Sequence, residues 1–413
     1  MKLILGNGKT AHSIAQFLDK QNTAFTLIKD TRKVKDSTPL KDIDEIFISP
    51  GIAQTDAIVV WASAQKIPVT SDIELFSRHA KAPIIGITGS NGKSTVTQLL
   101  GEMIANDGKK VAIGGNIGTP ALNCLNDAIE YYVLELSSYQ LDYTQNLNLL
   151  TGVVLNITPD HLDRYPSFAH YTHSKLSLYQ YCQHPIIPVD DPLIPTQTPA
   201  KYFGIDMPKQ PTDFGTVTCH QSRYFLKGDD SLMCADAMQL IGEHNLKNTL
   251  AALALGDQIG LSITSMINTI KTFKGLAHRL EWVTKKDNIT YYNDSKATNS
   301  LSTITAIQAL IPTQQDIILI MGGIAKQEDY TPLFTLINKH IKSVILIGKA
   351  TPQFTQKITH TTHAKTLQEA VTIAQSMISN GIVLLSPACA SFDMFDDFEQ
   401  RGEVFKDAVN SAH

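Results

Sequence analysis

The sequence has no excess of positive charge and no long apolar run. Its 413 residues include 35 Lys and Arg against 39 Asp and Glu, which gives a formal net charge of −4. Proteins that bind nucleic-acid or membrane phosphates usually carry a basic excess, so we expect no nucleic-acid partner. No apolar stretch approaches the ~20 residues that cross a bilayer, so we expect no insertion into a membrane.

The cysteines and the first residues exclude further classes. The five cysteines, at positions 124, 182, 219, 234 and 389, include no Cys-x-x-Cys pair. This pattern argues against a disulfide framework and against a zinc site. The apolar run before Gly6 has only three residues, fewer than a signal peptide needs. We therefore expect a cytoplasmic protein, and we expect a monomer.

Short apolar runs alternate with helical patterns along nearly the whole chain. This alternation is typical of parallel sheets flanked by helices, so the predicted fold class is α/β. The length predicts about three domains at roughly 150 residues each. We expect them at 1–80, 81–276 and 277–413, because His79–Pro83 and Gly275–Ala277 resemble connections between blocks. The predicted strands cover 2–5, 25–28 and 46–48, then 84–88, 131–136 and 152–157, then 317–320, 344–347 and 382–385.

The second block contains a proline-rich stretch. Seven of the 18 prolines fall between Pro185 and Pro211, and residues 201–235 alternate polar and apolar side chains without a helical period. We interpret this stretch as a small antiparallel insertion. A helix over about 244–258 would then return the chain to the core of the block.

A glycine loop follows the first predicted strand. Gly6-Asn7-Gly8-Lys9-Thr10-Ala11 matches the G-x-G-x-x-A pattern, and Asp30 ends the second strand. Glycines let the backbone approach a diphosphate, and the acid can accept a ribose hydroxyl. The pattern does not distinguish NAD(P) from another nucleoside diphosphate, and it also fits a tight turn that binds nothing.

A second glycine loop, Gly89-Ser90-Asn91-Gly92-Lys93-Ser94-Thr95, lies near the start of the second block. It does not have the strict P-loop spacing, because the first glycine of that motif would fall on Ile87. It does contain glycines that free backbone N–H groups, a lysine for the β- and γ-phosphates, and hydroxyls for Mg²⁺. The positive end of a helix dipole would add to the attraction. The loop therefore predicts a nucleotide phosphate site.

From this loop onward the sequence resembles the Mur ligase family. The resemblance spans all three blocks, and its last two motifs resemble the D-glutamate-adding members. The Asp-Asn-Pro-Arg motif of the diaminopimelate- or lysine-adding members is missing, which supports this choice. The matching segments are Gly89–Thr95, Gly114–Gly118, Leu134–Ser138, Asn156–Tyr165, Gly242–Asn245, Ala277–Arg279, Asn293–Asn299, Ser386–Ser391 and Phe398–Gly402.

The resemblance implies three domains, with Rossmann-like N-terminal and C-terminal domains around a central P-loop ATPase-type domain. It implies a ligase that joins D-glutamate to UDP-N-acetylmuramoyl-L-alanine in peptidoglycan precursor synthesis, with ATP as co-substrate. ATP would convert the carboxylate, a poor electrophile, into an acyl phosphate that an amine can attack. The first loop would then hold UDP, although Asn7 and Lys9 are more polar than expected. The implied UDP contacts are Gly8, Lys9, Thr10, Asp30, Thr31, Arg32 and Ser49.

The resemblance also assigns the remaining sites. It implies two Mg²⁺ ions and a carbamate on Lys175, which would be N6-carboxylated. From the residues alone, His161 would be an ordinary polar residue of the core or surface, and Lys175 an ordinary surface lysine. The implied catalytic residues are Lys93, Asn116, His161 and Lys175, and the implied metal ligands are Ser94, Thr95, Glu135, His161 and Lys175. The implied ATP contacts are Gly89, Ser90, Asn91, Gly92, Lys93, Ser94, Thr95, Asn245, Asn248, Arg279 and Asp294, with Lys296 as a further candidate. The implied D-glutamate contacts are Thr298, Lys326, Ser391 and Phe398.

Three other functions stay open at this stage. A folylpolyglutamate synthase of the same superfamily would lack a UDP-binding first block. The first loop alone would fit an NAD-dependent oxidoreductase, and the second alone would fit a P-loop switch or regulatory ATPase. Phosphate release that needs both UDP-N-acetylmuramoyl-L-alanine and D-glutamate would separate these from the ligase.

Overall fold

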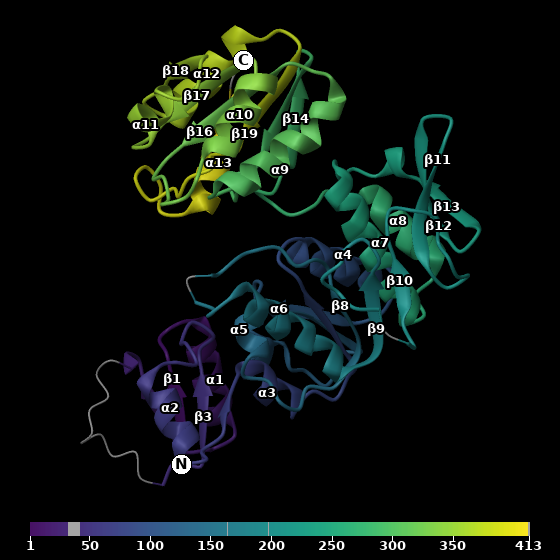
Figure 1. Cartoon of the computed structure of the whole chain (residues 1–413), viewed down its shortest axis with the longest axis vertical. Coiled ribbons are helices and arrows are strands. Elements are labelled where there is room, and N and C mark those ends of the chain that lie inside the picture. The colour runs from purple at the N-terminus through teal and green to yellow at the C-terminus, as the bar shows by residue number, and fades with distance from the viewer. Residues whose placement is uncertain (32–41, 163, 197, 412–413) are drawn as a thin grey trace. The chain divides into compact units, whose positions relative to one another are not determined.

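The computed structural model describes residues 1–31, 42–162, 164–196 and 198–411. This part of the chain forms two compact units (Figure 1). Unit 1 holds Met1–Met238 and His244–Phe273, and unit 2 holds Gln239–Glu243 and the chain from Lys274 onward. Unit 1 contains two sheets and unit 2 contains one, each flanked by helices. The predicted α/β class with three sheet-based blocks is confirmed.

The first sheet of unit 1 is built from β1 (Lys2–Leu5), β2 (Phe25–Ile28), β3 (Glu45–Ile48) and β4 (Val69–Thr70), with helices α1 (Lys9–Lys20), α2 (Ala57–Ala64) and α3 (Asp72–Ser77). Its strands are parallel in the order β2-β1-β3-β4. Successive side chains of a strand point to opposite faces. Leu3 and Leu5 therefore share a core with Ile58 of α2, whereas Ile4 shares one with Ala11 of α1.

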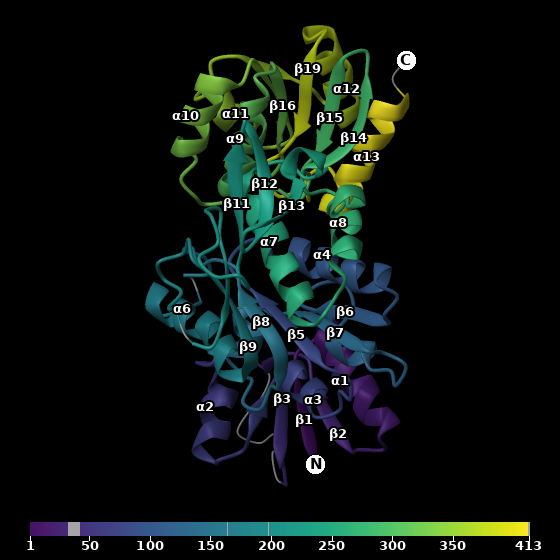
Figure 2. The same cartoon turned by 90° about the vertical axis from the view of Figure 1, so that its right-hand side faces the viewer.

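The second sheet of unit 1 has nine strands in the order β13-β12-β11-β10-β9-β8-β5-β7-β6 (Figure 2). Its strands are β5 (Ile84–Thr88), β6 (Val111–Gly115), β7 (Tyr131–Glu135), β8 (Leu149–Val154), β9 (Cys182–Pro188), β10 (Lys201–Phe203), β11 (Phe214–Cys219), β12 (Ser222–Lys227) and β13 (Asp230–Cys234). Its helices are α4 (Lys93–Asn106), α5 (Ser138–Leu141), α6 (Phe168–Leu176), α7 (Glu243–Gln258) and α8 (Ile263–Thr272), with short 3₁₀ turns η2 (Ala121–Cys124), η3 (Ser177–Tyr181) and η4 (Ala235–Ala237). All five residues of β5 are buried, as expected for a parallel strand covered on both faces.

Two details of this sheet differ from the sequence prediction. The strand predicted at 152–157 begins and ends three residues earlier, as β8. Beyond β8, Leu155 N still donates to Thr88 O at 2.9 Å, whereas Ile157 N donates to the Asp191 side chain at 2.7 Å. The predicted antiparallel insertion exists as β11, β12 and β13, but it extends the edge of the central sheet, because β10 pairs in parallel with both β9 and β11.

Unit 2 contains a six-stranded sheet in the order β14-β15-β19-β16-β17-β18. Its strands are β14 (Glu281–Lys286), β15 (Ile289–Asn293), β16 (Ile317–Gly322), β17 (Ser343–Ile347), β18 (Thr361–His363) and β19 (Gly381–Leu385). Its helices are α9 (Ser300–Leu310), α10 (Thr331–His340), α11 (Thr351–Thr355), α12 (Leu367–Met377) and α13 (Phe398–Ser411), with the turn η5 (Ile311–Thr313). Leu319 and Leu384 belong to a core on one face, whereas Ile318 and Val383 belong to a core on the other.

In this unit every strand pair except β14–β15 is parallel. Helices therefore cover both faces, as buried parallel sheets require. No helix in the described part of the chain is long and apolar enough to cross a bilayer.

Candidate functional site

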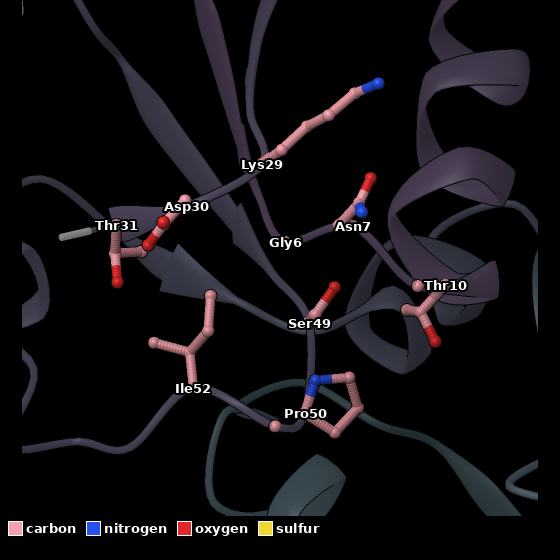
Figure 3. A pocket seen from close by; sticks show the side chains of 11 residues that line it. Gly6, Asn7, Thr10, Lys29, Asp30, Thr31, Ser49, Pro50 and Ile52 are labelled. Carbon is pink, nitrogen blue, oxygen red and sulfur yellow. The ribbon is translucent and has the colours of Figure 1, made fainter. Parts of the chain in front are cut away.

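A cavity of about 450 Å³ opens beside the first glycine loop (Figure 3). Its lining comes from the carboxyl ends of β1, β2 and β3, where ligands of parallel sheets bind. Gly6 has a φ of 126°, and a Cβ there would collide with Ser49 Oγ, so glycine is required for this close approach. Ser49 Oγ is buried and has no hydrogen-bond partner among the described residues. The cavity therefore contains a hydroxyl that a ligand could satisfy.

Most of the predicted UDP residues line this cavity. They are Gly8, Thr10, Asp30, Thr31 and Ser49. Lys9 begins α1 but does not line the cavity, and Arg32 lies outside the described residues. Gly8 is the N-cap of α1 and provides no side-chain cap, so the first N–H groups of that helix can bind an anion.

Four strand ends of the central sheet carry most of the predicted ATP and metal residues. The strands β8, β5, β7 and β6 are neighbours and run parallel, so their carboxyl ends lie at one edge. β5 leads into Gly89–Gly92, and β6 leads into Asn116. β7 ends at Glu135, and the chain after β8 reaches His161. The fold thus brings four separate sequence motifs together.

The loop Gly89–Gly92 has a backbone that requires glycine. Gly89 and Gly92 have φ values of 150° and 85°. A Cβ at Gly92 would collide with Asn248 Oδ1 of α7, so the glycine also lets α7 approach the loop. Asn156 holds the loop from the other side, because its Oδ1 accepts from Asn91 N at 2.9 Å and its Nδ2 donates to Asn91 O at 3.0 Å. These contacts hold the loop in one shape before any nucleotide binds.

Two lysines donate to one carbonyl oxygen of this loop. Lys93 Nζ donates to Gly89 O at 2.8 Å and to Ser90 O at 3.0 Å. Lys175 Nζ, from α6, donates to the same Gly89 O at 2.9 Å. Burial and the charge of Lys93 lower the pKa of Lys175 from 10.5 to about 7. Near neutral pH a large share of the Lys175 amine is therefore uncharged, which is the form that reacts with CO₂.

Glu135 presents a carboxylate oxygen that lacks a partner. Its Oε1 accepts from Asn116 Nδ2 at 2.8 Å, whereas its Oε2 is buried and has no hydrogen-bond partner among the described residues. A Cβ at Gly115 would collide with Glu135 O, so glycine is needed beside this carboxylate. A buried oxygen without a partner is costly. A hard cation such as Mg²⁺ would satisfy it, because Mg²⁺ prefers oxygen ligands.

The other predicted metal ligands lie near this edge but do not form a metal cluster by themselves. Ser94 is buried in the first turn of α4 and Thr95 is half-buried after it. His161 is partly exposed, with its ring centroid 5.0 Å from that of Tyr139. In the described ranges no group of three or more His, Cys, Asp or Glu is arranged to hold a metal. The predicted set contains only two such side chains, so hydroxyls, a modified lysine and nucleotide phosphates would have to complete it.

The predicted adenine contacts, Asn245 and Asn248, are buried on α7. Asn248 Nδ2 donates to Asn245 Oδ1 at 3.2 Å. Because Asn248 also lies against Gly92, this pair is next to the phosphate loop.

In unit 2 the predicted D-glutamate residues follow three neighbouring strands. Thr298 follows β15, Ser391 follows β19 and Lys326 follows β16, and these strands are adjacent and parallel. Ile324 and Ala390 exchange backbone hydrogen bonds of 2.9 and 3.0 Å. The loop that carries Lys326 therefore lies beside the loop that carries Ser391.

The remaining predicted residues of unit 2 lie at the same edge. Phe398 begins α13, and its carbonyl accepts from Ser295 Oγ at 2.8 Å. Lys296 Nζ is 3.7 Å from the centroid of the Phe398 ring. Asp294 is buried and accepts from Ser386 Oγ at 2.7 Å, and burial raises the pKa of Asp294 to about 7. Arg279 is exposed just before β14, the strand that pairs with β15.

Sequence reasoning missed several residues at these places. Lys29 and Ile52 line the cavity of the first sheet; Lys29 directly precedes Asp30, and that position could have identified it. Tyr171 OH lies 2.9 Å from Ser90 Oγ, and its ring centroid is 4.8 Å from Lys175 Nζ. Tyr171 is four residues before Lys175 on α6, a spacing that puts two side chains on one helix face.

Comparisons with known proteins agree with this geometry. The Mur ligase middle domain matches residues 87–256, and the Mur ligase glutamate ligase domain matches residues 278–389. A protein of Acinetobacter baylyi is 40% identical over 100% of this chain and 98% of its own length. The chain belongs to the Mur ligase family. A second relative of this Mur ligase, from Nitrosococcus oceani, is 38% identical over 98% of the chain and 96% of its own length. Both relatives are named UDP-N-acetylmuramoylalanine--D-glutamate ligase.

Solved structures share the Mur ligase fold at low identity. A pseudomurein peptide ligase type C from Methanothermus fervidus has a TM-score of 0.63 at 16% identity, with 99% of each chain covered. MurF from Acinetobacter baumannii has a TM-score of 0.63 at 17% identity, with 97% of this chain and 99% of that chain covered. These likenesses support the fold alone.

Proposed function

We propose that this Mur ligase is a UDP-N-acetylmuramoyl-L-alanine:D-glutamate ligase, an ATP-dependent enzyme of peptidoglycan precursor synthesis. The observation that carries the proposal is the near full-length similarity to two relatives of that name, at 38% and 40% identity. Its reaction transfers the γ-phosphoryl group of ATP to the carboxylate of UDP-N-acetylmuramoyl-L-alanine. The amine of D-glutamate then attacks the acyl phosphate, and phosphate leaves as the amide forms.

The UDP part of the substrate would bind in the cavity beside Gly6. Its size and its position at strand ends suit a nucleoside diphosphate, and the uncapped N-terminus of α1 suits the phosphates. Asp30 would accept hydrogen bonds from the nucleoside, and Ser49 Oγ would gain the partner that it lacks among the described residues. Thr10 and Thr31 would supply further polar contacts.

Lys93 would bind the β- and γ-phosphates of ATP after leaving Gly89 O and Ser90 O. Phosphoryl transfer of this kind depends mostly on positioning and charge neutralisation. Asn116, already hydrogen-bonded to Glu135, would contact the substrate carboxylate region and the γ-phosphate. Asn245 and Asn248 would contact adenine. Arg279 and Asp294 would be the ATP contacts that come from unit 2.

The residues present fit Mg²⁺, with Glu135 Oε2 as the clearest donor. We propose Ser94, Thr95, Glu135, His161 and a carbamate on Lys175 as the ligands of two ions. Bound Mg²⁺ supplies charge neutralisation for the phosphates. The carbamate is supported by the lowered pKa of Lys175, because only the neutral amine adds to CO₂.

D-Glutamate would bind at the edge of unit 2 formed by Thr298, Lys326, Ser391 and Phe398. A lysine and hydroxyls suit a dicarboxylate. We also propose that the first domain ends at residue 80 and the second at residue 276. We propose that the protein is a monomer of the cytoplasm, where ATP and UDP-linked precursors are present.

An amino-acid panel in a phosphate-release assay tests the proposal. We expect ATP hydrolysis to require both UDP-N-acetylmuramoyl-L-alanine and D-glutamate, with little or no release for L-glutamate or diaminopimelate. Phosphate release independent of the amino acid would indicate a regulatory ATPase instead. Oxidation of NAD(P)H, followed at 340 nm, should be absent.

A further inference from the structure

A buried arginine in α13 binds two of the loops at the carboxyl edge of unit 2. Arg401 is only 1% exposed. Its Nε donates to Ser295 Oγ at 2.9 Å, and its Nη2 donates to Ser295 O at 2.7 Å. Its Nη1 donates to Cys389 O at 3.1 Å. One guanidinium therefore ties the loop after β15 to the loop after β19.

The atoms that Arg401 binds are close in sequence to three predicted D-glutamate contacts. Ser295 lies three residues before Thr298, and Cys389 lies two residues before Ser391. Ser295 Oγ, which accepts from Arg401, donates in turn to Phe398 O at 2.8 Å. In addition to the pairing of β15 with β19, this single side chain therefore links the segments that carry Thr298, Ser391 and Phe398.

The charge of Arg401 has no ion-pair partner among the described residues. All three of its hydrogen bonds go to a hydroxyl or to backbone carbonyls, and it forms no ion pair with a carboxylate of the described residues. Asp294 and Asp393 act on it only through space. Burial lowers the pKa of Arg401 to about 10, so the group still carries its charge at neutral pH. An unpaired buried charge is costly to a fold.

We propose that Arg401 is the positioning residue of the amino-acid site. It holds the Ser295–Thr298 and Cys389–Ser391 loops at the separation that D-glutamate requires, and the carboxylates of bound D-glutamate add through space to the negative charge around it. This inference rests on the proposed function, because it takes D-glutamate as the ligand of these loops. The proposal gives Arg401 a role within the Phe398–Gly402 motif, in which only Phe398 had a predicted role, as a D-glutamate contact.

A role in folding alone makes a different prediction. If Arg401 only stabilised unit 2, its loss would reduce the amount of active enzyme or affect all substrates alike. A positioning role instead changes the KM for D-glutamate and leaves the KM for ATP nearly unchanged. Lys93 and the phosphate loop belong to unit 1, and Asp294, the proposed ATP contact next to Ser295, has its own hydrogen bond from Ser386 Oγ. The ratio of the two KM values therefore separates the two explanations.

The test compares four variants by steady-state phosphate release, with D-glutamate or ATP varied in turn. Arg401→Met removes the charge and all three donors, so the KM for D-glutamate should rise at least about tenfold, with the KM for ATP within about threefold. Arg401→Lys keeps the charge, so the KM for D-glutamate of this variant should rise less. Ser295→Ala removes one acceptor of Arg401 and the donor to Phe398 O, and should give an intermediate rise.

Lys406→Met is the matched control. Lys406 is a cation on the same helix, but it pairs with Glu403 at 2.7 Å and Glu281 at 3.5 Å rather than with the two loops. Both KM values should stay at the wild-type level. If Arg401→Met does not fold, Arg401→Lys and Ser295→Ala still carry the test.

Equal rises in both KM values, or a fall in kcat with the KM for D-glutamate unchanged, would overturn the positioning role. These outcomes differ from failure of the proposed function, in which the wild-type enzyme itself would show no phosphate release that depends on D-glutamate. Added guanidinium ion gives a further readout. It should lower the KM for D-glutamate of Arg401→Met toward the wild-type value, and no such response is expected for Lys406→Met.

Discussion

Replacing Lys93 by alanine should stop phosphoryl transfer while leaving the fold almost unchanged. The ammonium donates to two carbonyl oxygens, Gly89 O and Ser90 O. A hydrogen bond from a charged group contributes about 1.5–3 kcal/mol net, and values toward the low end apply where water competes. Lys93 is half-buried, so water can replace part of the loss. The free energy of unfolding should therefore fall by no more than about 2 kcal/mol.

The effect on catalysis should be much larger. Lys93 is a cation on a loop that Asn156 and the glycines already hold in shape, so its charge is positioned before the phosphates bind. Loss of one preorganised group that stabilises developing charge costs at least ~3 kcal/mol. This corresponds to a fall in kcat of roughly 150-fold or more.

Phosphate release at saturating substrates measures kcat, and urea unfolding followed by circular dichroism measures the free energy of unfolding. Lys110→Ala is the matched control, because Lys110 is exposed beyond the opposite end of α4. It should keep both wild-type activity and wild-type stability. Residual activity of Lys93→Ala above a tenth of wild type would refute the reasoning. So would an unfolding loss well above 2 kcal/mol, since the side chain would then be structural.

Three further predictions address other parts of the molecule. Ser391→Ala and Lys326→Ala should raise the KM for D-glutamate about tenfold and the KM for ATP little; a change in ATP alone would contradict this placement of the site. Lys175→Ala should abolish formation of the acyl phosphate itself, and a small carboxylic acid at high concentration should restore part of the activity. Full activity of Lys175→Ala in CO₂-depleted buffer would contradict the carbamate. Burial raises the pKa of Asp72 from 3.8 to about 6, so the stability that its proton contributes is present at low pH and is lost as pH rises through about 6. Asp72→Asn should thus change the free energy of unfolding little near pH 4 and raise it by up to about 3 kcal/mol near pH 8; an equal change at both pH values would show that the Asp72 carboxyl does not titrate in this way.

Much of the fold could be predicted because strands and glycine loops depend on nearby residues. The run Ile84–Thr88 is apolar throughout and forms a fully buried strand. The edges of elements were less predictable, as β8 shows. Its apolar run continues past Val154, but Ile157 N donates to Asp191, a residue far along the chain, rather than to a neighbouring strand.

The candidate site divides in the same way. The two glycine loops could be found from the sequence, because Gly89, Gly92 and Gly6 adopt backbone conformations that favour glycine and adjoin a strand and a helix. The role of Lys175 could come only from the resemblance to a family. Nothing near Lys175 in the sequence indicates that it is buried or that it reaches Gly89 O, 86 residues away.

The sequence by itself therefore determined the α/β class, the positions of the two glycine loops and the family. These depend on short patterns of apolar residues and glycines, whose conformational preferences act over a few neighbouring positions. Only the tertiary structure decided which side chains meet. The contact of Lys175 with Gly89 and that of Arg401 with Ser295, 106 residues apart, follow from the order of strands in the sheets. The lowered pKa values of both groups follow in turn from burial, a property of the packed molecule that no short segment of the chain possesses.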